Sequence, residues 1–427
     1  MRVLIQNGRL IDPANQHDAV CDLYIAEGKI VGLGQAPQGF TPDRVIDASG
    51  LIVCPGLIDL QAHLREPGQK HKGTIASETA AAVAGGITTL CCPPDTDPVI
   101  DSTAVVELIK LRAEQDGQAR VVILGALTKG LGGELISSMA KLKAAGCVGF
   151  SNAHQPVGNT VVLRRAMEYA ATLDMTVFLH AQDPSLSAGG MVHEGAVSTR
   201  LGLAGIPACS ETLEVARLLQ LIGHTGVRAH FSQLSTAKAL QLIGRARYDG
   251  LPVSADVAAH QLHLTQVDIA EFNSLCHVRP PLRTERDRDG LIEGVGSGAL
   301  NAICSDHQPH DRDAKLAPFA ETEPGISGLE TLLPLALRLR TKRVSLMRII
   351  DSLTREPARI LGLEVGHLSL GAPADVCIFD PDRYWRLEEA NMRSQGRNTP
   401  FLGWEFQGRV VYTLVDGRPV FELSGAA

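Results

Sequence analysis

The sequence predicts an α/β fold: a (β/α)8 barrel with a small composite β-domain built from both chain ends. Two observations predict it. The middle of the chain alternates short apolar runs with segments of helical periodicity, and the two ends contain β-rich runs broken by turn residues. A chain of 427 residues can bury a complete core, and a barrel of about 250 residues often forms one domain.

The two chain ends predict the β-domain. The runs VLIQNGRLI, DLYIAEGKIVGLG and RVIDASGLIV near the beginning, and WEFQGRVVYTLVDGRPVFEL near the end, are interrupted by Asn-Gly, Glu-Gly, Ser-Gly, Gln-Gly and Asp-Gly. Such pairs are hairpin signals. We therefore expect residues 1–53 to pair with residues 362–427 in one β-sandwich domain. Residues 54–361 are expected to form the barrel domain.

The middle of the chain predicts the barrel strands. Eight apolar runs follow one another: GLIDLQAH, ITTLCCP, RVVILGAL, VGFSN, TVFLHAQ, VRAHFSQL, LPVSADV and NAICSDH. The segments between them, such as ETLEVARLLQLIGHTG, place apolar residues at i, i+3, i+4 and i+7, which is typical of helices. Eight strands that alternate with helices over roughly 300 residues indicate a (β/α)8 barrel.

Composition excludes several classes of protein. The formal net charge of −7 argues against a general nucleic-acid binder. The first residues show no signal peptide, and no stretch approaches the ~18 apolar residues of a membrane span. The nine cysteines are scattered without a CxxC pair, which argues against a disulfide framework or zinc ribbon, and Cys91-Cys92 is expected in a buried strand. We expect a cytoplasmic location.

Polar residues follow several of the predicted strands, where barrels of this kind carry their chemistry. They are Gln61-Ala62-His63, Pro93-Pro94-Asp95, Ser151-Asn152-Ala153-His154, His180-Ala181-Gln182, His230 to Gln233, and Ser305-Asp306-His307. Their repetition at consecutive strand ends predicts a site at one face of the barrel.

Motifs along the whole chain carry a resemblance to a known family. PGLIDLQAHLREPG, GALTKGL, RLGLAGIP, SDHQPH, PFAETEPGISGLET, GAPADVCIFDP and NTPFLGWEFQGRVVYTLVDG occur in order. With them the chain resembles the dihydroorotases of the amidohydrolase superfamily, which implies an amidohydrolase-type barrel with a composite β-domain. The implied reaction is the reversible ring closure of N-carbamoyl-aspartate to dihydroorotate. One or two zinc ions would activate a water and polarise the amide carbonyl.

The resemblance implies a set of metal ligands that this sequence only partly retains. His63, His180 and Asp306 match a strand-1 histidine, the strand-5 histidine and the strand-8 aspartate, which also serves as proton shuttle. Three positions have lost their ligand: Gln61, Asn152 (with Ala153, where an FSDDG-like stretch is usual) and Gln233. Neutral amides are poor zinc ligands compared with imidazole and carboxylate groups. We therefore expect no bound metal, no other cofactor and no catalytic residue, with Asp306 vestigial.

The same resemblance implies changes in the substrate pocket. Arg65 matches the arginine that binds the substrate carboxylate with two hydrogen bonds. Asp95 and Arg279 each stand where the family has an asparagine. A carboxylate at position 95 would repel a substrate that carries two carboxylates. We expect these three residues to be remnants of a substrate pocket.

Each retained residue also has a structural interpretation. His63 and His180 can be ordinary barrel-mouth histidines, and Asp306 can cap a turn or pair with a nearby histidine. Arg65 can hold a loop through a salt bridge to Glu66 or Asp95. His260 and His263 favour the start of a helix over a metal pair, and His307 and His310 favour a pocket wall.

Two hypotheses of function follow. The chain lacks metal ligands at Gln61, Asn152-Ala153 and Gln233, and in this it resembles a degenerate subgroup of dihydroorotase-like chains. Members of that subgroup assemble with the catalytic chain of aspartate carbamoyltransferase. This resemblance implies a non-catalytic subunit of pyrimidine biosynthesis that stabilises that enzyme and forms dimers within a larger hetero-oligomer, without nucleic acid or membrane. The alternative is an active, zinc-dependent dihydroorotase or another cyclic amidohydrolase with a reduced metal site. The sequence determines neither the interface and stoichiometry nor a ligand of the pocket.

Overall fold

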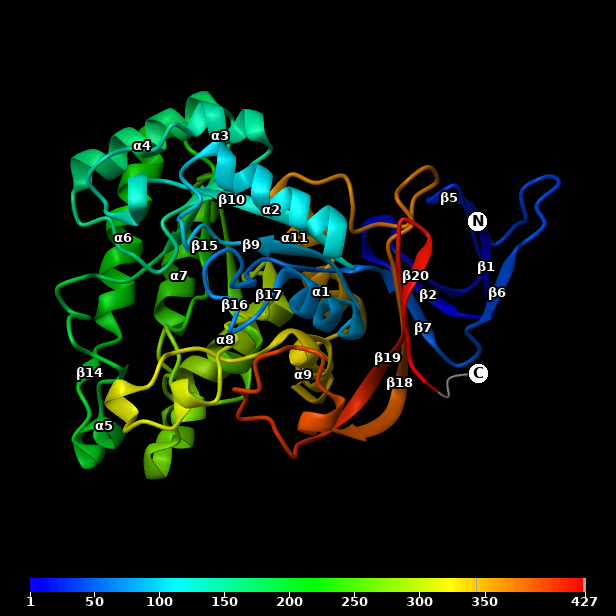
Figure 1. The fold of residues 1–427 in the computed structure, drawn as a ribbon. Helices are drawn as coiled ribbons and strands as arrows, with labels where there is room; N and C mark the ends of the chain where they lie inside the picture. Colours follow the sequence, from blue (N-terminus) through cyan, green and yellow to red (C-terminus); the bar gives the residue numbers. More distant parts are fainter. Residues whose placement is uncertain (343, 425–427) are drawn as a thin grey trace.

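Eight parallel strands form the centre of the molecule in the computed structural model, which describes residues 1–342 and 344–424 (Figure 1). The strands are β8 (Leu57–Asp59), β9 (Ile87–Cys92), β10 (Arg120–Ala126), β11 (Gly149–Ser151), β12 (Thr176–His180), β15 (Ala229–Ser232), β16 (Val253–Ala258) and β17 (Ala302–Cys304). They are hydrogen-bonded in this order, and a parallel bridge between Ala62 and His307 brings the first and last together. The predicted (β/α)8 barrel is confirmed, and Cys91 and Cys92 lie in a buried strand as expected.

Helices surround this barrel (Figure 1). They are α1 (Ile75–Ala84), α2 (Thr103–Asp116), α3 (Met139–Ala145), α4 (Thr160–Thr172), α5 (Ala196–Leu201), α6 (Cys209–Thr225), α7 (Ala237–Tyr248), α8 (Glu285–Ser297), α9 (Leu332–Leu337), α10 (Leu346–Leu353) and α11 (Arg355–Leu361). The side chain of Thr74 caps α1 by accepting the backbone N–H of Ser77. In α6, Val215, Leu218 and Ile222 are buried at helical spacing, as the periodicity predicted. No helix within the described part of the chain has the length and apolar character of a membrane span.

The barrel interior contains a buried apolar cluster, beside which His230 is hydrogen-bonded to Ser254 and Asp256. Ile58, Leu124 and Phe178 from the strands are buried in one cluster with Ile360 and Leu361. The last two residues belong to α11, so this helix closes the end of the barrel opposite the carboxyl ends of the strands. The interior is therefore a packed core, and polar groups meet at the other end.

Two further sheets are built from the chain ends. One contains N-terminal strands alone, in the order β5-β4-β1-β6. The other combines strands from both ends, in the order β20-β19-β18-β7-β2-β3. Their bounds are β1 (Arg2–Gln6), β2 (Arg9–Asp12), β3 (His17–Val20), β4 (Leu23–Ala26), β5 (Lys29–Leu33), β6 (Arg44–Asp47), β7 (Ile52–Pro55), β18 (Val376–Arg386), β19 (Glu405–Val415) and β20 (Arg418–Glu422). One hydrophobic cluster, including Ile5, Leu23, Val376 and Leu414, joins residues of the two sheets. Strands β1 and β20, which belong to opposite ends of the chain, both lie at this β-rich side (Figure 1).

The segment between β18 and β19 reaches back onto the barrel. The amide of Asn398 donates to the carbonyl oxygens of Gln308 (2.9 Å) and Gly325 (3.1 Å), and its Oδ1 accepts the backbone N–H of His310 (2.8 Å). Asn398 is buried. The C-terminal part of the chain therefore helps to position the loop that follows β17.

Candidate functional site at the barrel mouth

The polar residues predicted from the strand ends meet at the carboxyl face of the barrel. Gln61 and His63 follow β8, Asn152 follows β11, Gln233 follows β15, and Asp306 follows β17. All five are buried. Parallel strands of a barrel place their carboxyl ends on one face, which explains why a strand-end pattern located this site.

His63 is engaged at both ring nitrogens. Its Nδ1 lies 3.1 Å from Oδ1 of Asp95, and its Nε2 lies 3.4 Å from Nε2 of Gln61. An amide nitrogen can only donate, so Nε2 of His63 accepts and the Nδ1–H donates to Asp95. Burial alone would raise the pKa of Asp95, but His63, His154 and Arg65 hold it well below its usual range. Asp95, expected as a pocket remnant, therefore serves as the partner of His63.

Asp306 is held by two amides. Nε2 of Gln233 and Nε2 of Gln308 both donate to Oδ1 of Asp306, at 3.1 and 3.0 Å. Among the described residues, Oδ2 of Asp306 has no hydrogen-bond partner. Burial, together with the charges of Asp256 and Asp59, raises the pKa of Asp306 well above its usual range. The expectation that this carboxylate pairs with a histidine is wrong, because the hydrogen bonds to its Oδ1 come from Gln233 and Gln308.

Asn152 faces a neighbouring loop. Its Oδ1 accepts from Oγ1 of Thr128 (2.7 Å), and its Nδ2 donates to the carbonyl oxygens of Leu131 (3.0 Å) and Gln155 (2.9 Å). The whole amide is therefore satisfied within the chain. A carboxylate at this position could not donate to the two carbonyl groups.

His154 is a site residue to which the strand-end pattern assigned no role. Its ring centroid lies 5.9 Å from that of His63 and 4.7 Å from that of His180, so one imidazole contacts both retained histidines. Burial, with His180 and His63 nearby, lowers the pKa of His154 well below its usual value. Its Nε2 has no hydrogen-bond partner in the described chain. The only sequence signal for a role of His154 was its position in the polar segment Ser151–His154, directly after a predicted strand.

His180 contacts a neighbouring glutamine. Its Nε2 lies 3.0 Å from Oε1 of Gln182. Burial and the nearby charge of Arg279 together lower the pKa of His180 to about 4, although the hydrogen bond to Gln182 opposes the shift. His180 is therefore neutral at neutral pH.

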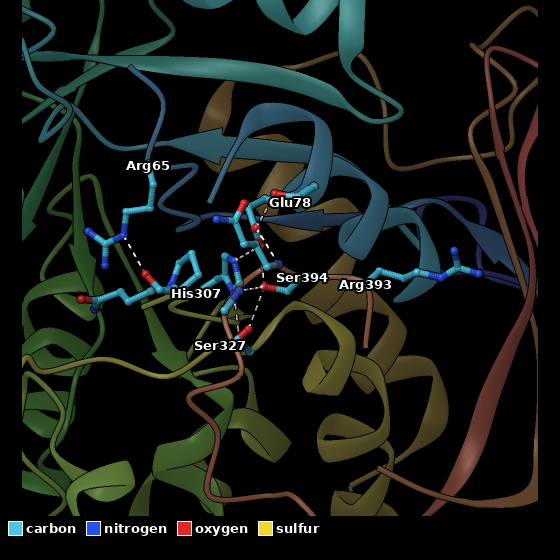
Figure 2. Close-up of polar contacts among 12 residues, drawn as sticks. Arg65, Glu78, His307, Ser327, Arg393 and Ser394 are labelled. Carbon is cyan, nitrogen blue, oxygen red and sulfur yellow. Dashed lines mark hydrogen bonds and ion pairs between the residues drawn. The ribbon is translucent and has the colours of Figure 1, made fainter. Parts of the chain in front are cut away.

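Arg65 binds the loop after β17. Its Nε donates to the carbonyl oxygen of Pro309 at 3.1 Å (Figure 2). Its Nη1 donates to Oε1 of Gln69 at 3.4 Å. The expected salt bridge from Arg65 to Glu66 or Asp95 is wrong, because a backbone carbonyl takes that place. Glu66 pairs with Lys70 at 2.7 Å instead.

A second polar cluster fastens the C-terminal segment to the barrel (Figure 2). Nε2 of His307 lies 2.8 Å from Oε2 of Glu78, and Nδ1 of His307 accepts the backbone N–H of Gly328 at 3.1 Å. Oγ of Ser394 donates to the same carboxylate oxygen at 2.6 Å and accepts from Ser327 at 3.1 Å. Burial would raise the pKa of Glu78, but these hydrogen bonds lower it overall. His307 therefore has a structural role.

The other histidines also have structural surroundings. Nε2 of His310 contacts the carbonyl oxygen of Pro324 (3.0 Å), and its Nδ1 lies 3.3 Å from Glu323. His260 lies in a short 3-10 helix (Ala259–Leu262), and His263 follows it directly. This agrees with the interpretation of a helix start.

Two small cavities lie at the mouth. A cavity beside His63, Arg65 and Asp95 has a volume of about 10 Å³, and one beside Asn152 and His180 has about 20 Å³. Each has room for about one water molecule.

These residues do not fit a metal centre. Both nitrogens of His63 and one oxygen of Asp306 already have partners, and amides stand at Gln61 and Gln233. Within residues 1–342 and 344–424, no group of three or more His, Cys, Asp or Glu side chains is placed to hold a metal ion. Catalytic zinc sites usually need three protein ligands around an open position.

Comparisons with known proteins agree with this architecture. The family model "Dihydro-orotase-like" matches residues 50–239, and "Amidohydrolase family" matches residues 323–421. A "Dihydroorotase-like protein" of Pseudomonas aeruginosa is 50% identical over 423 residues, covering 99% of this chain and 100% of the relative. A "Dihydroorotase" of a Geobacter species is 42% identical over 426 residues, covering 99% and 100%.

Solved structures show the same fold. The L-hydantoinase (dihydropyrimidinase) of Arthrobacter aurescens superimposes with a TM-score of 0.89 at 25% identity, covering 98% of this chain and 96% of that one. A D-hydantoinase superimposes with a TM-score of 0.84 at 21% identity, covering 99% and 95%.

Proposed function

The chain belongs to the dihydroorotase-like family of amidohydrolases, and on this premise we propose that it is a non-catalytic member that acts as a structural subunit. In this proposal it stabilises and assembles the aspartate carbamoyltransferase complex of pyrimidine biosynthesis. We place it in the cytoplasm.

One observation carries the proposal: glutamine amides contact the two implied metal ligands near β8 and β17, which are His63 and Asp306. Gln61 contacts His63 at 3.4 Å, and Gln233 donates to Asp306 at 3.1 Å. A water without a metal keeps its ordinary pKa of about 15.7 and is a feeble nucleophile. We therefore derive no hydrolytic step at this site.

The size of the mouth supports the same proposal. The cavities beside His63 and His180, at about 10 and 20 Å³, have room for a water but not for the six-membered ring of dihydroorotate. Arg65, which would bind a substrate carboxylate, donates to Pro309 and Gln69. Binding of that substrate would require this loop contact to break.

The names of the relatives differ with their identity to this chain. Relatives that are 50% identical, from Pseudomonas aeruginosa and Pseudomonas putida, are called "Dihydroorotase-like protein". Relatives at 42% identity are called "Dihydroorotase". The chain is therefore more similar in sequence to these two Pseudomonas proteins than to the two relatives called "Dihydroorotase".

The partner follows from the losses at Gln61, Asn152 and Gln233, which the chain shares with the degenerate subgroup it resembles. The proposal is supported by a barrel core and end sheets that are complete although amides stand at the implied metal positions. We propose dimers of this chain that bridge catalytic trimers of aspartate carbamoyltransferase in a larger hetero-oligomer.

The second candidate is an active zinc-dependent dihydroorotase or related cyclic amidohydrolase. It is favoured by the retention of His63, His180 and Asp306 at the mouth and by relatives named "Dihydroorotase". It requires the side chains around Asp306 and His63 to rearrange so that a metal can replace the amides.

Co-expression with the aspartate carbamoyltransferase catalytic chain tests the two candidates. We expect the chains to co-elute as a complex with a mass of several copies of each, with less than a tenth of an equivalent of zinc, and without dihydroorotate hydrolysis. Separate elution would contradict the partner. About one equivalent of zinc with turnover, abolished by Asp306→Asn, would contradict the non-catalytic role. The Asp306→Asn control separates activity of this chain from that of a contaminating hydrolase.

A further inference from the structure

A candidate ligand pocket lies away from the barrel mouth. A pocket of about 440 Å³ lies between the end of α1, α9 and the strands β18, β19 and β20. It is far larger than the cavities at the mouth. Because its walls come from the barrel side and from the C-terminal strands, a molecule bound there would contact both.

Three arginines line this pocket: Arg383, Arg393 and Arg409. Over residues 1–342 and 344–424, no carboxylate oxygen lies within 4.0 Å of any of these guanidinium groups, and their side-chain nitrogens make no hydrogen bond. Arg393 extends away from Glu78 and His307 toward the C-terminal strands (Figure 2). The pocket therefore gathers three positive charges without a matching negative charge.

Arg409 is held in place without being neutralised. Its guanidinium carbon lies 4.9 Å from the ring centroid of Trp385, and the indole Nε1 donates to the carbonyl oxygen of Gly408 at 2.9 Å. A cation–π contact fixes the position of a cation but supplies no counter-charge. Burial lowers the pKa of Arg409, and the neighbouring charge of Arg383 lowers it further. The two cations are close enough to repel one another.

The two acidic residues of the pocket wall do not offset these charges. Oε2 of Glu422 lies 2.6 Å from Nη2 of Arg44, which lies outside the pocket lining. Glu330 accepts the backbone N–H groups of Arg393 (2.7 Å) and Ser394 (3.4 Å). Burial raises the pKa of Glu330 to about 7, so part of its charge is absent at neutral pH.

A second basic pocket shows the contrast. It has a volume of about 710 Å³ and lies at the opposite end of the barrel from the mouth. There Arg228 pairs with Asp174 at 3.0 Å, and Arg359 pairs with Glu356 at 2.8 Å. Those two cations already have carboxylate partners within the chain, and Arg247 of the same lining donates to the carbonyl oxygen of Ala299 and to Oδ1 of Asn301.

We propose that the pocket lined by Arg383, Arg393 and Arg409 binds a small polyanion that carries at least two phosphate or carboxylate groups. Guanidinium groups bind both kinds of oxyanion with paired, charge-assisted hydrogen bonds. Two anionic groups on one ligand would each pair with a guanidinium group and so offset the repulsion between Arg383 and Arg409. The bound ligand would also hold the C-terminal strands against the barrel.

Isothermal titration of the full chain tests this proposal, with inorganic pyrophosphate as one probe and citrate as the other, at low ionic strength where such contacts are strongest. We expect saturable binding with one site per chain and a rise of the melting temperature with probe concentration. Binding of pyrophosphate alone assigns a phosphate ligand, and binding of citrate alone assigns a carboxylate ligand; either supports the site.

Matched variants locate the binding. Arg383→Gln with Arg409→Gln should weaken it at least about tenfold, and the exposed Arg393→Gln, which leaves the buried contacts intact, should weaken it several-fold. Arg228→Gln with Arg359→Gln removes two cations of the other pocket and should leave binding unchanged. The proposal is overturned by the absence of saturable binding of both probes up to about 10 mM, a level well above typical affinities for specific ligands. The proposal is also overturned if Arg393→Gln binds the probes as tightly as the unchanged chain. It is overturned as well if only the control variant, Arg228→Gln with Arg359→Gln, loses binding of the probes.

Discussion

The side-chain amide of Gln233 donates a hydrogen bond of 3.1 Å to Oδ1 of Asp306, joining the carboxyl ends of β15 and β17. In a metal-bearing barrel this carboxylate oxygen would face a cation. Here an N–H group holds the oxygen, and Gln308 donates to the same atom at 3.0 Å. The two amides together provide hydrogen-bond partners for a buried carboxyl group.

Restoring histidines at two amide positions should raise zinc affinity. Gln61→His with Gln233→His replaces two donors by imidazoles, and we expect tighter binding than either single change gives, because ligands act as a unit. Asn152 is left unchanged, since its amide donates to two carbonyl groups. Equilibrium dialysis with zinc measures the effect.

Two exposed glutamines provide the control for that variant. Gln220→His with Gln241→His adds the same number of imidazoles on the outer surfaces of α6 and α7. If the mouth variant binds zinc no more tightly than this control, the assignment of Gln61 and Gln233 to metal positions is wrong.

Removing the imidazole of His154 should increase zinc affinity further. Its ring contacts His63 and His180, with centroid distances of 5.9 and 4.7 Å, and so occupies space between potential ligands. Added to the two restored histidines, His154→Ala should tighten zinc binding several-fold, measured by the same dialysis. His71→Ala, at an exposed histidine, is the control. An unchanged affinity would mean that His154 does not obstruct the site.

The buried pair of Glu78 and His307 should contribute strongly to stability. Glu78→Gln places an amide where the carboxylate accepts from His307 and Ser394, so buried donors would face one another. We expect a loss of about 3 kcal/mol in the free energy of unfolding, measured by urea denaturation. Glu107→Gln, at an exposed position of α2, should change it by less than about 0.5 kcal/mol. Equal effects of the two substitutions would rule out this role.

Glu330 should make stability depend on pH. Burial raises the pKa of its carboxyl group from 4.5 to about 7, although the backbone N–H groups of Arg393 and Ser394 oppose this. The folded state therefore binds the proton more tightly than the unfolded state. The stabilisation is complete below about pH 4.5 and is lost as the pH rises through about 7.

The variant Glu330→Gln removes this titration. Relative to the unchanged chain, its free energy of unfolding should rise between pH 5 and pH 8 by up to about 3 kcal/mol. Urea denaturation at both pH values measures it, with Glu107→Gln as the control. A difference that stays constant with pH would show that Glu330 titrates normally.

Local patterns were enough to predict the barrel and the place of the site. Strands such as Arg120–Ala126 are continuous apolar runs, and helices such as Cys209–Thr225 repeat their apolar residues at helical spacing. Both signals depend on residues close together in the chain. Polar residues at the strand ends then predicted where His63, His180 and Asp306 would lie, because parallel strands end at one face.

The partners of those residues were not predictable in the same way. Arg65 binds Pro309, which is 244 positions away, and not the adjacent Glu66. Gln233 and Asp306 are 73 positions apart, and Glu78 and His307 are 229 apart. No periodicity in the sequence connects such pairs.

The sequence by itself therefore determined the family resemblance and the barrel, and it predicted Gln61, Asn152 and Gln233 at positions where that resemblance implies metal ligands. Only the tertiary structure decided that His154 contacts both His63 and His180 and that Arg383 and Arg409 share a pocket in which, among the described residues, no carboxylate oxygen lies within 4.0 Å of either guanidinium group. The physical reason is range: strand and helix periodicity is a local property, whereas a hydrogen bond or ion pair depends on how distant loops pack in three dimensions.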